Sequence, residues 1–127
     1  MSGVIGVGID LVDVERLARV LERRPGMLDR LFTTAEQSTA SSGGRRIERL
    51  AARFAAKEAL MKALGVGLGG FRLADCEVVN DPSGRPSLVL HDSALDAAAR
   101  AGVDRLDVSL THTSTMASAV VLAGTQR

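Results

Sequence analysis

The segment that decides the fold is "RFAAKEALMKALG", residues 53–65, which has the periodicity of a helix. Four large apolar residues fall on one stripe when the chain turns by about 100° per residue: Leu50, Phe54, Met61 and Leu64. Lys57 lies in the middle of that stripe. The neighbouring strip holds two charges among alanines: Ala51, Ala55, Glu58 and Lys62. The segment therefore predicts a helix that packs against the core and has only small side chains beside a Glu-Lys pair.

The composition is that of one small domain over residues 1–127. A chain of 127 residues with 46% hydrophobic content can bury a single core. Aromatic residues make up only 2%, which disfavours binding of nucleic acid by base stacking. The net charge of +1 provides no general attraction to nucleic acid or to an anionic membrane. We expect no nucleic-acid partner and no membrane partner.

Cysteine content and the first residues predict a cytoplasmic protein. Cys76 is the single cysteine, so no internal disulfide can form and a zinc site is disfavoured. The N-terminal residues lack a basic lead-in and reach Asp10 too early for a signal peptide. No apolar run approaches the roughly 18 residues that cross a bilayer.

The pattern along the chain predicts a strand, several helices and two hairpins. In chain order these are a strand at 4–12, a helix from an Asp13 cap to about Arg24, a short helix opened by a Thr33–Glu36 capping box, a loop at 38–46, the long helix at 47–64 closed by Gly65, a hairpin at 76–91, a helix capped by Ser93 to about Ala101, and a hairpin at 105–124. This order predicts an α+β fold, with a largely antiparallel sheet and a long central helix.

Two carboxylates stand out as candidate metal ligands. The predicted first strand has Ile5, Val7, Ile9 and Leu11 on one face and Gly6, Gly8 and Asp10 on the other. If the alanine strip of the long helix packs on this bare face, Asp10 and Glu58 meet, and a cation such as Mg²⁺ would relieve their repulsion. The alternative is that Asp10 leads into the next helix while Glu58 is a surface charge paired with Lys62.

Basic residues on the same helix are candidate phosphate ligands. Lys57 and Lys62 flank Glu58, and Arg53 lies one turn earlier. A phosphate on the metal would explain both lysines; alternatively, Lys57 extends out of the core stripe to solvent and Lys62 is an ordinary surface charge.

Two further features are weaker signals. "GVGLGG", residues 65–70, can bring backbone amides to a phosphate, or it can simply be a flexible helix exit. His112, in "SLTHTST", is either structural or part of a site. His91 has no context that assigns it a role.

Arginines recur on one side of the predicted first helix, at Arg16, Arg19 and Arg23, with Arg30 nearby. This stripe is either a solvated face or a surface that steers an acidic helix of another protein.

Three motifs together resemble one family. "GVGIDLVDVERL" (6–17) is similar to its Gly-x-Asp opening with an arginine six residues after the aspartate. "RLAARFAAKEALMKALGVGLG" (49–69) resembles its hallmark helix, and "VSLTHTSTMASAVVLA" (108–123) its closing Ser-x-x-His hairpin. The family is the holo-acyl-carrier-protein synthases, the short 4'-phosphopantetheinyl transferases, and the resemblance covers nearly the whole chain.

The resemblance implies transfer of the phosphopantetheine arm of coenzyme A to a serine of apo acyl carrier protein, with release of adenosine 3',5'-bisphosphate. It implies Mg²⁺ held by Asp10 and Glu58. Glu58 would be the base, directly or through a metal-bound water, and Lys62 would stabilise the departing phosphate.

The resemblance also implies how substrates and partners bind. Five residues would hold coenzyme A: Arg53, Lys57, Gly65, Gly67 and His112. Three would bind the carrier: Arg16, Arg23 and Arg30. For Lys57, contact with a neighbouring subunit is an equal alternative. The family forms homotrimers with active sites between subunits.

Two other functional classes compete with the transferase: a non-catalytic module that holds an acidic partner, and a magnesium-dependent nucleotide hydrolase. The sequence leaves open whether the carrier serves fatty acid or polyketide synthesis, whether acylated coenzyme A is accepted, and whether Mg²⁺ or Mn²⁺ works better.

Overall fold

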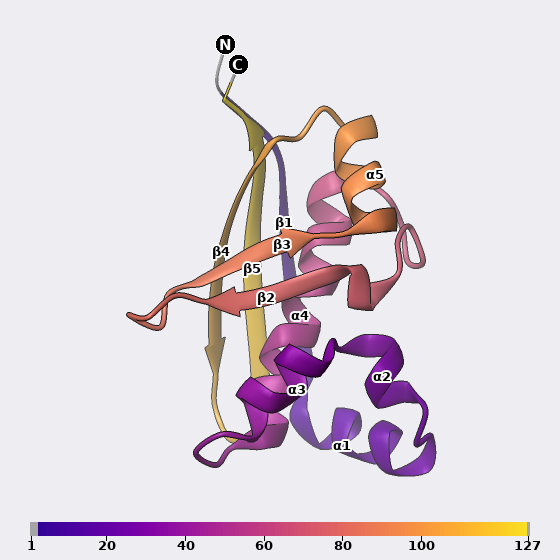
Figure 1. Cartoon of the computed structure of the whole chain (residues 1–127), viewed down its shortest axis with the longest axis vertical. Coiled ribbons are helices and arrows are strands. Elements are labelled where there is room, and N and C mark those ends of the chain that lie inside the picture. Colours follow the sequence, from indigo (N-terminus) through magenta and orange to yellow (C-terminus); the bar gives the residue numbers. More distant parts are fainter. Residues whose placement is uncertain (1–2, 127) are drawn as a thin grey trace.

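The computed structural model describes residues 3–126 (Figure 1). Its elements in chain order are β1 (Gly3–Asp13), α1 (Val14–Arg23), α2 (Met27–Leu31), α3 (Thr34–Ser41), α4 (Arg46–Leu64), the 3-10 turn η1 (Leu73–Asp75), β2 (Cys76–Asn80), β3 (Pro86–Leu90), α5 (Asp92–Arg100), β4 (Arg105–His112) and β5 (Met116–Thr125).

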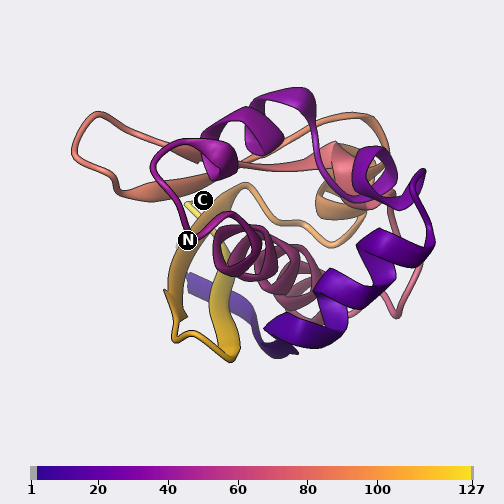
Figure 2. The ribbon, with the colours of Figure 1, turned by 90° about the horizontal axis from the view of Figure 1, so that it is seen from below.

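All strand pairing is antiparallel. One sheet has the order β1-β5-β4, and β2 pairs with β3 in a separate two-stranded hairpin. Figure 2 shows α4 nearly along its axis, enclosed between the three-stranded sheet and the layer that contains α3 and the β2–β3 hairpin. The predicted α+β fold with a long central helix is confirmed.

The backbone of α4 packs directly against the backbone of β1. A Cβ on Gly6 would overlap the carbonyl oxygen of Ala63, and a Cβ on Gly8 would overlap that of Ala59. The two backbones can approach this closely only because the strand has no side chains there and the helix has only alanines. Alanines of the helix do pack on the bare strand face, but they are Ala59 and Ala63, which lie beside the predicted strip and not within it. This contact directs Asp10, next on the glycine face, toward α4.

Lys57 lies in the core, fully buried. Its ammonium donates to Glu36 Oε1 at 2.8 Å, to the Leu73 carbonyl at 3.0 Å and to the Cys76 carbonyl. The idea that this side chain extends to solvent is wrong, because a buried carboxylate on α3 provides its countercharge. Glu36, in turn, accepts from Thr33 N at 3.0 Å, within the predicted capping box, which is confirmed.

Two local predictions need correction, and one short helix was not predicted. The predicted loop at 38–46 begins too early, since α3 continues to Ser41. Residues 27–31, which received no assignment, form α2. Ser93 does not cap α5; the capping position is His91, and Ser93 Oγ donates to Asp75 Oδ2 at 2.6 Å, so a partner outside the helix competes for the hydroxyl.

The apolar face of β1 points away from α4. Ile5, Val7, Ile9 and Leu11 are between 49% and 65% exposed in the single chain. Exposed apolar patches on this scale mark interaction surfaces. Separately, among residues 3–126 no helix has the length and apolar content to cross a bilayer.

Gly8→Ala should destabilise the protein by at least about 2 kcal/mol, because the added methyl overlaps backbone that cannot move alone. Urea denaturation of the variant and of the wild type would measure the difference in the free energy of unfolding. Gly26→Ala is the matched control, since its Cβ would meet nothing within 4 Å. Equal stability of the Gly8→Ala variant and the wild type would contradict the described contact between β1 and α4.

Candidate active site

Asp10, Glu58 and Lys62 lie together where β1 meets the C-terminal half of α4. Lys62 Nζ donates to the Ile9 carbonyl at 2.9 Å and to Asp10 Oδ1 at 3.1 Å. Asp10 and Glu58 line the same cleft. The interpretation of Glu58 as a surface charge paired with Lys62 is not supported, because the lysine bonds to the strand, and Glu58 is half-buried.

The surroundings of Glu58 change the proton affinity of its carboxyl group. Burial raises the pKa of its carboxyl group above the ordinary value, and the negative charge of Asp10 raises it further. The positive charge of Lys62 lowers it in part. A carboxylate that is half-buried beside a second carboxylate has an elevated proton affinity and also favours a cation.

Three hollows meet at Glu58. One, of ≈ 570 Å³, extends along α1 past Arg16 and Phe54. The second is lined by Arg30, Phe71 and Arg72, and the third by Lys62, Gly65 and Gly67. Leu68, which is 85% exposed, borders all three. A ligand at Glu58 therefore has room to extend in more than one direction.

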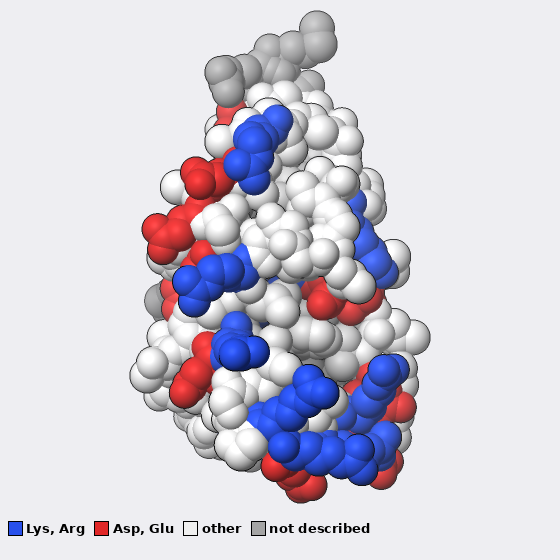
Figure 3. All heavy atoms as spheres, turned by 90° about the vertical axis from the view of Figure 1, so that its right-hand side faces the viewer, with Lys and Arg blue, Asp and Glu red and all other residues white. Residues whose placement is uncertain are grey.

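Two of the three predicted docking arginines line these hollows. Arg16 lines the cleft with Asp10, and Arg30 lines the second hollow. Arg23, in the last turn of α1, is exposed like the other two. Figure 3 shows basic side chains gathered over the face formed by α1 and α2, with acidic side chains between them. The surface has the charge to attract an acidic segment.

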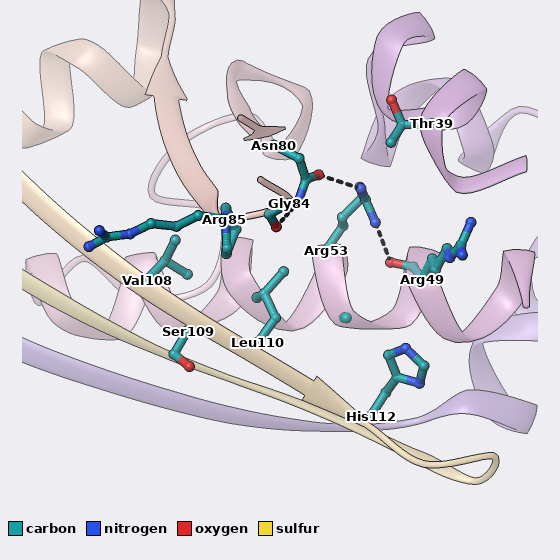
Figure 4. A pocket seen from close by; sticks show the side chains of 12 residues that line it. Thr39, Arg49, Arg53, Asn80, Gly84, Arg85, Val108, Ser109, Leu110 and His112 are labelled. Atoms are coloured by element: carbon teal, nitrogen blue, oxygen red, sulfur yellow. Dashed lines mark hydrogen bonds between the residues drawn. The ribbon is translucent and has the colours of Figure 1, made fainter. Parts of the chain in front are cut away.

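Arg53 and His112 lie in a different cleft, of ≈ 560 Å³, which also contains Arg49, Asn80 and Arg85 (Figure 4). Its residues come from α3, α4, the β2–β3 hairpin and β4. Arg53 and Glu58 are five positions apart, about 140° around the helix axis. The structure therefore does not bring Arg53 and His112 to Asp10 and Glu58 within one chain.

Arg53 is unusual in being 6% exposed while lining a cleft. Its Nη2 donates to Asn80 Oδ1 at 3.0 Å and its Nη1 to the Arg49 carbonyl at 3.2 Å. Its Nε has no hydrogen-bond partner among residues 3–126. Burial lowers the pKa of the guanidinium, Glu36 raises it and Arg49 lowers it. The cleft that contains Arg53 and His112 is thus positively charged and suited to an anion.

The glycines and Lys57 have separate positions. Gly65 ends α4 in the left-handed conformation (φ 70°), and Gly67 borders the hollow that contains Lys62. Lys57 lines none of the clefts described above, and its ammonium is fully engaged in the core. We therefore do not retain it as a ligand for coenzyme A.

Sequence reasoning did not identify Arg49, Arg85 or Leu68. Arg49 could have been found, because it lies one turn before Arg53 on the same helix face. Arg85 in a turn and Leu68 in a glycine-rich loop carry no pattern that indicates their positions.

The donors present fit a small hard cation. No group of three or more His, Cys, Asp or Glu side chains within residues 3–126 forms a complete metal site. Two carboxylates, Asp10 and Glu58, share one cleft. Mg²⁺ suits such a set, because it keeps several waters and takes phosphate oxygens as further ligands.

Comparisons with known proteins identify the family. Residues 6–120 match the model of the 4'-phosphopantetheinyl transferase superfamily. The chain is 50% identical over 120 residues to a holo-[acyl-carrier-protein] synthase of Salinispora arenicola, a match that covers 94% of this chain and 98% of the relative.

Solved structures agree. The holo-[acyl-carrier-protein] synthase of Neisseria meningitidis superimposes with a TM-score of 0.85 at 27% identity, over 95% of this chain and 98% of the other. The Helicobacter pylori enzyme in complex with coenzyme A gives 0.79 at 28% identity, over 92% and 98%. Sequence and fold together show that this chain belongs to the holo-[acyl-carrier-protein] synthases of the 4'-phosphopantetheinyl transferase superfamily.

Proposed function

We propose that the chain transfers the 4'-phosphopantetheine arm of coenzyme A to a serine hydroxyl of an apo acyl carrier protein, releasing adenosine 3',5'-bisphosphate. The observation that carries the proposal is the cluster of Asp10, Glu58 and Lys62 where three hollows meet. The names of the relatives and the coenzyme A complex of one of them support both substrates.

Asp10 and Glu58 are the proposed ligands of Mg²⁺. The repulsion that raises the pKa of Glu58 supports this assignment, since a cation between the two carboxylates would remove it. When bound, the ion supplies charge neutralisation at the diphosphate of coenzyme A.

The side chains then have separate tasks. Glu58 accepts the proton of the incoming serine hydroxyl, because its carboxyl group lies where the three hollows meet. Lys62 donates to the phosphate that departs, and its 56% exposed side chain has the freedom to turn from Asp10 toward a ligand. Gly67 has no side chain, so the backbone at this position can come close to the nucleotide.

The active form is proposed to be a homotrimer with sites between subunits. Two observations support this: the exposed apolar face of β1 and the separation of the two clefts in one chain. In a closed ring, the Arg53–His112 cleft of one subunit can face the Asp10–Glu58 cleft of the next and hold the nucleotide phosphates. Each site would then be complete only in the assembly.

The carrier protein is proposed to dock on Arg16, Arg23 and Arg30. Their exposure and the position of two of them beside the hollows at Glu58 support this role. An acidic helix on this surface would bring its serine toward Glu58.

We also propose a cytoplasmic location, where the buried Cys76 stays reduced. Burial raises the pKa of its thiol to about 12.

Incubation with apo carrier protein, coenzyme A and Mg²⁺ should add the mass of one phosphopantetheine arm to the carrier, as read by mass spectrometry. Glu58→Gln should lower kcat at least about 100-fold, because the base is lost. Glu48→Gln, the same change ten residues earlier on α4, is the control and should stay near wild type. Carrier binding without a mass gain would indicate a docking module, and adenosine bisphosphate formed without carrier a hydrolase.

Removal of divalent ions with EDTA should lower kcat by at least about 100-fold, and Mg²⁺ in excess should restore it. Circular dichroism before and after would show that the fold is retained. Undiminished turnover by a preparation shown to be metal-free would remove the ion from the proposal.

Mixed trimers test the shared site. Arg53→Ala and Glu58→Gln should each be nearly inactive alone. After the two are dissociated and reassembled together, about a quarter of the sites should combine an intact Arg53 with an intact Glu58 of the neighbouring subunit. The transfer activity of the mixed trimers should therefore recover to about a quarter of the wild-type activity. No recovery in mixed trimers verified by native mass spectrometry would mean that each subunit holds its own complete site.

A further inference from the structure

The segment 66–73, here called the strap, forms a wall beside Glu58. Leu68, Gly69, Phe71 and Leu73 line the second hollow, and Val66 and Gly67 line the third. A substrate that contacts Glu58 from either hollow therefore contacts the strap as well.

Hydrogen bonds hold the strap at its two ends, and the side chain of Phe71, which is 5% exposed, packs into the core. At its start, Val66 N donates to the Met61 carbonyl at 3.1 Å, continuing the exit of α4. Within it, Gly70 N donates to the Gly67 carbonyl at 3.0 Å, and Leu68 is 85% exposed. The turn from Gly67 to Gly70 therefore takes its position from the anchors on either side of it.

The anchor at its far end is the buried ammonium of Lys57. Lys57 Nζ bonds to the carbonyls of Leu73 and Cys76, which lie at the two ends of η1. Arg72 N adds a bond to Ser93 Oγ at 2.8 Å from α5. Leu73 thus lines the second hollow and also accepts a hydrogen bond from Lys57.

Glu36 fixes the direction of that ammonium. Its Oε1 lies 2.8 Å from Lys57 Nζ, and its Oε2 accepts from Val78 N at 2.9 Å. The pair therefore ties together α3, α4, η1 and β2. The ring of Phe32 lies 5.6 Å below the ammonium and closes the site.

Stability alone does not explain this pair. Two buried charges are costly to desolvate, and apolar side chains of similar volume often stabilise a core equally well. What an ammonium adds is direction, because its donors point at fixed acceptors. Here those acceptors include a carbonyl of the strap.

We propose that Lys57 and Glu36 are positioning residues that set where the strap lies beside Glu58 and thereby how tightly coenzyme A binds. This rests on the proposed function for the identity of the ligand. The chemistry itself should be spared, because Asp10, Glu58 and Lys62 are held by the contact of β1 with α4, which the pair does not touch.

The main test is the double variant Lys57→Met/Glu36→Gln. The single change Lys57→Met leaves Glu36 buried without its countercharge, so loss of the fold is expected there. The double variant removes both charges, keeps the volumes and leaves a glutamine oxygen that can still accept from Val78 N. It should unfold cooperatively.

In this variant the KM for coenzyme A should rise about tenfold while kcat stays within about threefold, since the wall is displaced and the reacting groups are not. Hydrogen exchange of the strap amides should accelerate about tenfold, with the amides of α4 unchanged. Leu50→Ala is the control: it opens a core cavity some 22 Å along α4 from Gly65 and should leave both measurements at the strap as in the wild type.

A folded double variant with wild-type KM, or with wild-type exchange in the strap, overturns the positioning role. An equal rise in KM and in strap exchange in Leu50→Ala overturns it too, because general loosening would then suffice. Failure of the wild type to transfer phosphopantetheine would instead count against the proposed function. The exchange measurement needs no activity and still decides the positioning role.

Discussion

The contact that the rest of the structure depends on is the approach of one backbone to another, where α4 lies on Gly6 and Gly8 of β1. No side chain separates helix and strand there, so their relative position is fixed within the tolerance of van der Waals contact. Asp10 continues the glycine face, and Glu58 and Lys62 lie on the helix beside it. One carboxylate from the strand and one from the helix therefore reach the same cleft, and neither depends on a loop for its position.

Side-chain periodicity was enough to predict α4 and the bare face of β1, but it left the meeting of Asp10 with Glu58 as one of two alternatives, between which the family resemblance decided. These follow from patterns within a few turns or residues, together with the rule that small faces pack on small faces. The capping box at Thr33 and Glu36 was predictable for the same reason, since all its partners lie within four residues.

What the sequence did not reveal depends on partners far along the chain. Lys57 looked like a phosphate ligand because its countercharge, Glu36, lies 21 residues away on a helix whose packing no local pattern indicates. Ser93 looked like a cap because Asp75, which it bonds, is 18 residues away. The separation of Arg53 and His112 from Glu58 depends on which faces of α4 become covered, and this is a property of the whole fold.

Residues 57 and 58 are neighbours, yet one step around α4 takes the chain from a sealed core to an open cleft. The sequence contains two lysines, and they divide the same way: Lys57 is fully buried and Lys62 is 56% exposed at its side chain. Reagents that acylate lysine side chains, or resins that couple through them, thus find their accessible lysine ammonium beside Asp10 and Glu58. Immobilisation or labelling of this protein through its exposed lysine would therefore obstruct that cleft.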